Sequence, residues 1–326
     1  MRIPAFLLAL LLGSTIAWAQ ASTGQATPQQ TQAPAQGSGQ ATGSTSGQTP
    51  SNSQATPASH RMLQAKTQEE LKAYQDADAA MKADPAQAET AANNFATKFP
   101  DSELRSALYV KVMNMYAQAG NSEKMVEIGR KAIAADPTNP IPLMEVASTL
   151  AETTRENDLD REQRLAEAAK DAQAAIDNVD TGLLVPANAD PERVAGAKRT
   201  ILTNSYDTLA MVNMGRNDYA AAVTNLQKAI DASKGNPDPV LYLRLSVAQD
   251  KLQQYQPALD SANKAVQYSK DGTPAQNLAK QQQERLQKLI AGSQSDGKAA
   301  VSPAPPAAPG AQTSPSPAPG QPNPPH

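Results

Sequence analysis

Apolar positions recur at helical spacing through residues 63–293, whereas neither end of the chain shows such a period. Tyr206, Leu209 and Ala210, for example, share one helix face at i, i+3 and i+4. The segment is rich in Ala, Leu, Gln, Lys, Glu and Met, which favour helices, and it has no β-branched runs that would favour strands. This pattern predicts an all-α domain of about eleven helices in antiparallel pairs, with a long helix from about Pro191 to Met214.

Helix boundaries are marked by recurring local signals. An aspartate followed by proline offers an N-cap and a first-turn residue whose missing N–H costs nothing there. Glycine beside a polar residue is typical of a helix end. Thr67 with Glu70 fits a capping box. The expected starts are Asp84-Pro85, Asp190-Pro191 and Asp238-Pro239, and the expected stops are Gly120-Asn121 and Asp271-Gly272.

The helix pairs are similar to one another in sequence. Tyr206, Leu209 and Ala210, followed by Tyr219, Ala222, Leu226 and Ala229, reappear 36 positions later as Tyr242, Leu245 and Ser246, followed by Tyr255, Ala258, Ala262 and Ala265. Small alanines let two helices approach closely, and the aromatic side chain fills the space beside them. Further units begin at Tyr109 and Leu143, and a weaker one spans residues 71–100.

These motifs resemble the tetratricopeptide repeat (TPR), in which aromatic, Leu-Gly and Ala positions recur over about 34 residues. The resemblance implies a TPR-like α-solenoid of about five helix-turn-helix units plus a C-terminal capping helix over about residues 273–289. The chain departs from a uniform array in two places. About nine extra residues lie between Leu150 and Ala168, and a loop from Asn178 to Asp190 breaks the period.

The first residues are typical of an export signal. Arg2 precedes the apolar run 3–12, and Ala17-Trp18-Ala19 has small residues where a signal peptidase cleaves. We expect cleavage after Ala19 and an exported, periplasmic or secreted protein with no membrane span after cleavage. An uncleaved membrane anchor is the alternative, although the run is short for a bilayer.

Both ends of the chain are low in complexity. Residues 20–60 consist of Gln, Ser, Thr, Gly, Ala, Pro and a few other uncharged residues, and residues 294–326 carry ten prolines. Such segments cannot bury enough apolar surface to offset the entropy of ordering. We therefore expect a disordered linker over 20–62, the repeat domain over 63–293 and a disordered tail over 294–326. The PxxP sequence 306–309 is either a docking motif or part of a spacer.

The residues needed for most enzymatic chemistry are scarce. There is no Cys, and the only two histidines, His60 and His326, fall in the low-complexity ends. The formal net charge of −3 gives no electrostatic reason to bind nucleic acid. We expect no catalytic residues, no cofactor and no metal site, although an enzyme using only Asp, Glu, Lys, Ser or Tyr stays an alternative.

Three fragments offer other interpretations. Ser261 and Lys264 match a Ser-x-x-Lys pattern, but its companion motifs are absent. Asp158, Asp160 and Glu162 could supply calcium ligands, or Asp160 could cap the next helix. The apolar stretch 182–186 either docks a partner or packs on the repeat core.

The resemblance implies that the concave side, formed by the first helix of each pair, binds a protein partner. Methionines there would suit an extended or helical apolar segment, because Met adapts its shape, although Met at helical spacing is often core. The leading hypothesis is a scaffold or adaptor in the bacterial cell envelope, and the alternative is a structural spacer acting through its tails. The predicted groove residues are Val110, Asn114, Met144, Ser148, Asp207, Met211, Met214, Leu243 and Val247.

Overall fold

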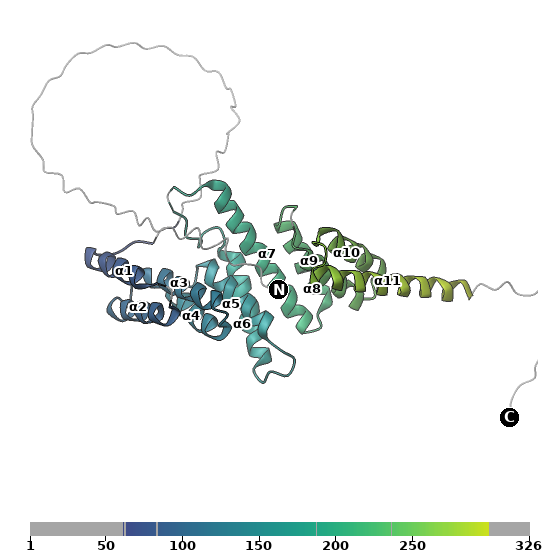
Figure 1. Cartoon of the computed structure of the whole chain (residues 1–326), viewed down its shortest axis with the longest axis horizontal. Coiled ribbons are helices and arrows are strands. Elements are labelled where there is room, and N and C mark those ends of the chain that lie inside the picture. Colours follow the sequence, from purple (N-terminus) through teal and green to yellow (C-terminus); the bar gives the residue numbers. More distant parts are fainter. Residues whose placement is uncertain (1–60, 62, 83, 187, 236, 300–326) are drawn as a thin grey trace, which may run out of the picture.

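The described part of the computed structural model is an array of helix pairs. It covers residues 61, 63–82, 84–186, 188–235 and 237–299, and within it every named element is a helix. Figure 1 shows the pairs following one another along the long axis from α1 to α11. The helices are α1 (Gln68–Ala80), α2 (Pro85–Lys98), α3 (Leu104–Gln118), α4 (Ser122–Ala135), α5 (Pro140–Thr153), α6 (Arg161–Asn178), α7 (Pro191–Gly215), α8 (Tyr219–Ala232), α9 (Pro239–Lys251), α10 (Tyr255–Tyr268) and α11 (Pro274–Ala299).

This arrangement confirms the predicted all-α, TPR-like solenoid. The five pairs α1/α2, α3/α4, α5/α6, α7/α8 and α9/α10 are followed by the single helix α11. The long helix predicted from Pro191 to Met214 is α7. The terminal helix α11 continues to Ala299, ten residues beyond the predicted end at Leu289 and past the expected domain boundary at residue 293.

The predicted N-caps form as local hydrogen bonds. The carboxylates of Asp84, Asp190 and Asp238 accept from backbone N–H groups two residues on, at 2.9, 3.1 and 2.8 Å. Thr67 accepts from the N–H of Glu70 at 3.0 Å, while the Glu70 carboxylate accepts from the N–H of Lys66. The bonds to the four N-cap side chains satisfy donors that the first turn of a helix leaves free, and the Glu70 carboxylate satisfies the N–H of Lys66 just before the cap.

One turn geometry recurs at the same repeat position. Gly120, Asn217 and Gln253 end the first helix of their pairs with φ of 76°, 61° and 60°. A left-handed residue lets the chain reverse into the second helix, and glycine adopts this conformation without strain. The equivalent position in the third unit is Thr154, with φ of −75°, and there the inserted loop leads to α6 instead.

The core depends on close approach between helices. A Cβ atom on Gly129 of α4 would lie 2.3 Å from Cγ2 of Val146 on α5 and 3.1 Å from the Met113 sulfur on α3. The side chains of Met113 and Val146 are themselves fully buried. Glycine at this point therefore lets three helices meet without a gap.

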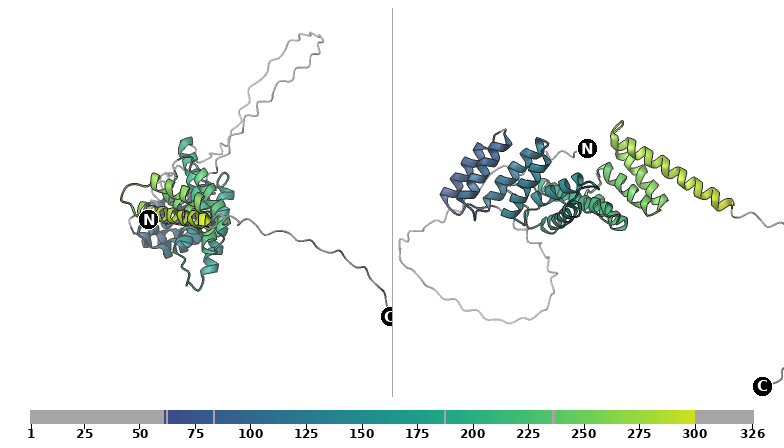
Figure 2. Two further views of the ribbon diagram at one scale, coloured as in Figure 1. Left: turned by 90° about the vertical axis from the view of Figure 1, so that its right-hand side faces the viewer. Right: turned by 90° about the horizontal axis from the view of Figure 1, so that it is seen from below.

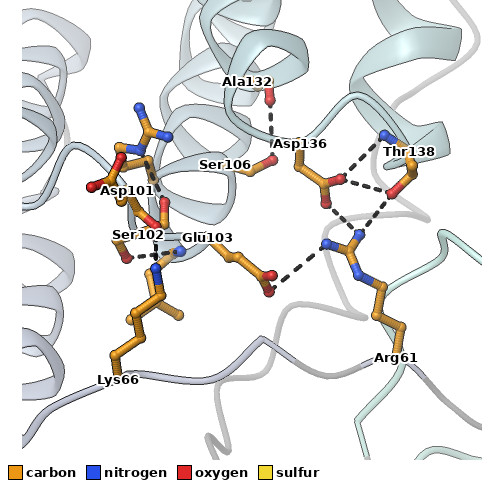
Figure 3. A network of polar contacts seen from close by, with 11 residues as sticks. Arg61, Lys66, Asp101, Ser102, Glu103, Ser106, Ala132, Asp136 and Thr138 are labelled. Atoms are coloured by element: carbon orange, nitrogen blue, oxygen red, sulfur yellow. Dashed lines mark hydrogen bonds and ion pairs between the residues drawn. The ribbon is translucent and has the colours of Figure 1, made fainter.

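The segment before α1 is fastened to the middle of the array. Arg61 donates to Oδ2 of Asp136 at 2.6 Å and to Oγ1 of Thr138 at 3.0 Å, and it pairs with Glu103 at 3.8 Å (Figure 3). Its carbonyl accepts from the N–H of Val185 at 3.3 Å. Arg61 was assigned to the disordered linker, and this assignment is wrong for that residue. Sequence patterns could not reveal these contacts of Arg61, because its partners lie at least 42 positions away and are brought close only by the fold.

Candidate interaction surface

The first helices of the pairs lie on the inner side of the array. Among the described helices, α1 packs on α3, α5 on α7 and α9 on α11, whereas no two even-numbered helices pack as closely. Elements on the inside of a curved stack are nearer to each other than those on the outside. The right-hand view of Figure 2 shows the array bowed, with both of its ends on the same side of the middle. We call the exposed face of α3, α5, α7 and α9 the inner face.

Two of the nine predicted groove residues are core residues. Val110 and Met144 are each only 1% exposed and belong to the main hydrophobic cluster. They occupy equivalent positions, one residue after Tyr109 and Leu143, where the side chain packs within the array. The prediction that they line a groove is therefore wrong, because an apolar side chain there is covered by the protein itself.

Asp207 is also buried, at 9% exposed, but for a different reason. Its Oδ2 accepts a hydrogen bond from the Arg244 guanidinium on α9. Its Oδ1 is buried and has no hydrogen-bond partner. Burial raises the pKa of the Asp207 carboxyl, and Arg244 acts in the opposite direction.

The remaining predicted residues are half-buried. Met214 packs beside the cluster around Ala210 and Leu226, and Leu243 packs beside the cluster around Tyr242. The structure therefore brings part of the predicted set to an accessible position. The six half-buried residues are Asn114, Ser148, Met211, Met214, Leu243 and Val247.

Met211 and Val247 are the clearest candidates for contact with a partner. They lie 36 positions apart, at the same place in successive repeats, on α7 and α9. Among the described hydrophobic clusters, neither residue is a member or a packed neighbour. Half-buried apolar side chains outside every described cluster have apolar surface left to bury.

Ion pairs that the sequence analysis missed join neighbouring inner helices. Lys111 on α3 reaches Asp78 on α1 at 2.6 Å, Arg244 on α9 reaches Asp207 on α7, and Arg285 on α11 reaches Asp250 on α9. The partners lie 33, 37 and 35 positions apart. Opposite charges separated by about one repeat length were the signal that could have revealed them.

Helix α5 differs from the other inner helices. Its only charged residues are Glu145 and Glu152, and within the described residues neither forms an ion pair or a hydrogen bond through its carboxylate. Burial, and to a smaller extent the nearby Glu152, raises the pKa of Glu145 to about 7. Glu145 is nevertheless partly exposed to solvent.

The three fragments with alternative interpretations are structural in the described residues. The Ser261 hydroxyl is buried and donates to Gln249 at 2.7 Å, while Lys264 lies over the Tyr242 ring. In the apolar loop, Leu183 and Val185 are buried in the main cluster, so the loop packs on the core.

The acidic segment before α6 has no metal-site geometry. The Asp158 carboxylate accepts from the N–H of Arg155 at 2.8 Å. Asp160 stands at the N-cap of α6 but makes no side-chain cap bond, contrary to expectation. No group of three or more His, Asp or Glu side chains is arranged to hold a metal within the described residues. In the same part of the chain no helix has the length and apolar character to cross a bilayer.

No family model and no curated protein matches the chain. Solved structures with a similar helix arrangement include a MamA protein, 18% identical over 64% of this chain and 100% of that one, with a TM-score of 0.38. Acl4, the assembly chaperone of RpL4, is 11% identical over 69% of this chain and 98% of that one, with a TM-score of 0.36. The TPR domain of P58(IPK) is 13% identical over 72% and 68%, with a TM-score of 0.26.

Proposed function

We propose that the protein is a non-catalytic scaffold or adaptor that binds a segment of another protein on its inner face. The observation that carries this proposal is the pair Met211 and Val247, which repeats the same half-buried apolar position on α7 and α9. A partner that covers both residues gains the free energy of burying their remaining apolar surface. Methionine also adapts to partners of different shape.

The site of action that we propose is the bacterial cell envelope. This part rests on the export-type sequence at residues 1–19, which lies outside the described residues. An exported chain without cysteine has no disulfides and depends for its stability on non-covalent interactions, to which the continuous buried cluster from α1 to α7 contributes. The solenoid would then present the inner face to envelope proteins.

The test is crosslinking and affinity capture from native envelopes. Wild type is compared with Met211→Glu plus Leu243→Glu, which places two carboxylates on the half-buried apolar surface. Circular dichroism first establishes that the variant keeps its helical content. A matched control carries Glu156→Gln, an exposed residue in the loop between α5 and α6.

A discrete partner captured by wild type and by the control, but lost in the double variant, supports the proposal. Identical capture by all three proteins refutes binding on the inner face. The spacer hypothesis would then lead, and deletion of residues 300–326 would test whether the C-terminal segment is required.

A further inference from the structure

Exposed apolar side chains gather at the C-terminal end of the array. Of the four large apolar side chains that are exposed among the described residues, three lie on the last two helices: Tyr268, Leu278 and Leu289, at 44%, 54% and 38% exposed. Tyr268 is the last residue of α10, and both leucines are on α11. Single exposed apolar residues are ordinary, whereas three on consecutive helices indicate a surface that a binding segment covers.

The two leucines lie along one side of α11, which continues beyond the other helices at that end of the array (Figure 1). They are eleven positions apart, which is three turns of an α-helix to within about 20°. At the turns between them, Gln282 and Arg285 reach the Asp250 carboxylate on α9. Ala279 and Leu286, on the adjoining stripe, are buried against α9 and α10. The exposed leucines therefore flank the stripe that packs α11 onto the array.

Tyr268 adds an aromatic surface at the start of this side of α11. Its ring stacks on the ring of Tyr242 of α9, with centroids 5.5 Å apart and planes 10° from parallel. Tyr242 also packs in the cluster that contains Ala279, the residue next to Leu278. One repeat earlier the position of Tyr268 is occupied by Ala232, so this ring is particular to the last unit.

The segment that follows α11 has the composition to cover these side chains. Residues 300–326 include ten prolines and contain no Lys, Arg, Asp or Glu. Proline-rich sequences favour the extended polyproline II conformation, which binds to aromatic side chains and loses little conformational entropy on doing so. A segment without charged side chains also loses no charge hydration when it covers leucines.

The same segment is long enough to return to Tyr268. The 26 residues of α11 span about 39 Å, at about 1.5 Å per residue. A polyproline II chain advances about 3.1 Å per residue, so about 13 residues cover the length of the helix. If the chain turns back at Ala299, Pro305 would fall near Leu289 and Pro315 near Tyr268.

We propose that residues 300–326 fold back along α11 and dock on Leu289, Leu278 and Tyr268, with prolines against the tyrosine ring. This segment is the occupant in preference to another protein because it is tethered to the surface, at an effective concentration in the millimolar range. A free partner of equal affinity would need that concentration to displace it. Docking would close the end of the solenoid, where a repeat stack otherwise leaves its last apolar surface open. The inference goes beyond the proposed function and does not depend on it.

The test detects the segment beside α11 with a nitroxide spin label in the full chain. Ser316 lies between two prolines, and the chain has no cysteine, so Ser316→Cys carries the label at a single site. The NMR signals of isotope-labelled tyrosine rings and leucine methyl groups report which residues the label approaches. The reference is a chain of the same length with the same label, in which Ser and Gly replace the ten prolines, because such a tether approaches α11 only by chance.

Three variants establish which side chains hold the segment. Tyr268→Ser and Leu278→Ser each remove one docking contact. Leu159→Ser is the matched control, because it removes an exposed leucine from the loop between α5 and α6. Circular dichroism first establishes that each variant keeps the wild-type helical content.

We expect the label to broaden the Tyr268 ring and Leu278 methyl signals beyond detection in the chain with its natural prolines. Both signals should stay visible in the Ser/Gly reference. Tyr268→Ser should restore the Leu278 signal and Leu278→Ser the Tyr268 signal, whereas Leu159→Ser should change neither. In a mixture of spin-labelled chains with isotope-labelled chains that lack the nitroxide, both signals should stay visible.

Three results would overturn the inference. Equal broadening by the natural segment and by the Ser/Gly reference would mean that the prolines do not dock. Broadening that survives both Tyr268→Ser and Leu278→Ser would place the segment elsewhere. Loss of the signals in the mixture would assign this surface to the segment of a second copy of the chain. None of these results alters the capture test of the inner face, so the two proposals fail separately.

Discussion

Replacing Arg61 by alanine tests whether a residue outside the helices holds the repeat array together. Its Nη1 lies 2.6 Å from Oδ2 of Asp136, whose side chain is only 3% exposed, whereas the Arg61 side chain is 27% exposed. The change leaves Asp136 as a buried carboxylate without its cation. It also removes the hydrogen bond to Thr138 and the weaker pair with Glu103.

The magnitude follows from what remains after the substitution. Removing one partner of a fully buried ion pair typically costs about 3–5 kcal/mol. Here Oδ1 of Asp136 still accepts from the N–H and the hydroxyl of Thr138, at 3.1 and 2.8 Å, and solvent screens the partly exposed Arg61. We therefore expect the free energy of unfolding to fall by about 2 kcal/mol.

The assay is urea denaturation followed by far-ultraviolet circular dichroism, with a double-mutant cycle. Asp136→Asn removes the charge that Arg61 pairs with, so Arg61→Ala should lower the free energy of unfolding by less in that background than in wild type. The difference, which is the coupling energy between Arg61 and Asp136, should exceed about 1 kcal/mol. Lys72→Ala is the control, because it breaks an exposed i, i+4 pair with Asp76 and should change little. If Arg61→Ala stays as stable as Lys72→Ala, the contact in Figure 3 contributes nothing and the reasoning is wrong.

Three further predictions follow from packing, capping and charge. Gly129→Ala should lower the free energy of unfolding by about 1–2 kcal/mol, since its Cβ would overlap Val146. In the Gly129→Ala background, Val146→Ala should lower the free energy of unfolding by less than it does in wild type, and denaturation curves of the four proteins would show this. Gln254 occupies an N-cap without a side-chain bond, so Gln254→Asp should raise the urea midpoint and stabilise by about 1 kcal/mol; an unchanged midpoint would contradict the capping argument. Glu145 is an acid whose pKa in the folded protein, about 7, lies above its unfolded value of 4.5. Its contribution to the stability of the fold is therefore fully present below the unfolded pKa and is lost as the pH rises to about 7. The free energy of unfolding of Glu145→Gln should thus equal that of wild type near pH 4 and exceed it by about 1–3 kcal/mol near pH 8. Burial also raises the pKa of Asp171, to about 6, but this residue is present in both proteins and its contribution cancels in the difference. Parallel profiles of unfolding free energy against pH across this range would refute the prediction.

The inner face was only partly predictable from the sequence. Helical geometry places Met211 and Val247 off the packing stripe, and the structure finds both half-buried. The same reasoning failed for Val110 and Met144, which are covered by the array. A periodic pattern gives the angle of a side chain around its own helix, but burial depends on how far the next helix is rotated and displaced. Irregular connections, such as the loop before α6, change that displacement from one pair to the next.

What the sequence determined by itself is local. The aspartate caps at 84, 190 and 238 and the long helix α7 depend on groups within a few positions of one another, so neighbouring residues decide them. Tertiary structure alone decided that Arg61 is part of the folded body and that Asp207 pairs with Arg244. It also decided that Glu145 forms no ion pair within the part of the chain that the structure describes. These outcomes depend on which surfaces successive helix pairs bring together, and the free energy of that packing belongs to residues far apart in the chain.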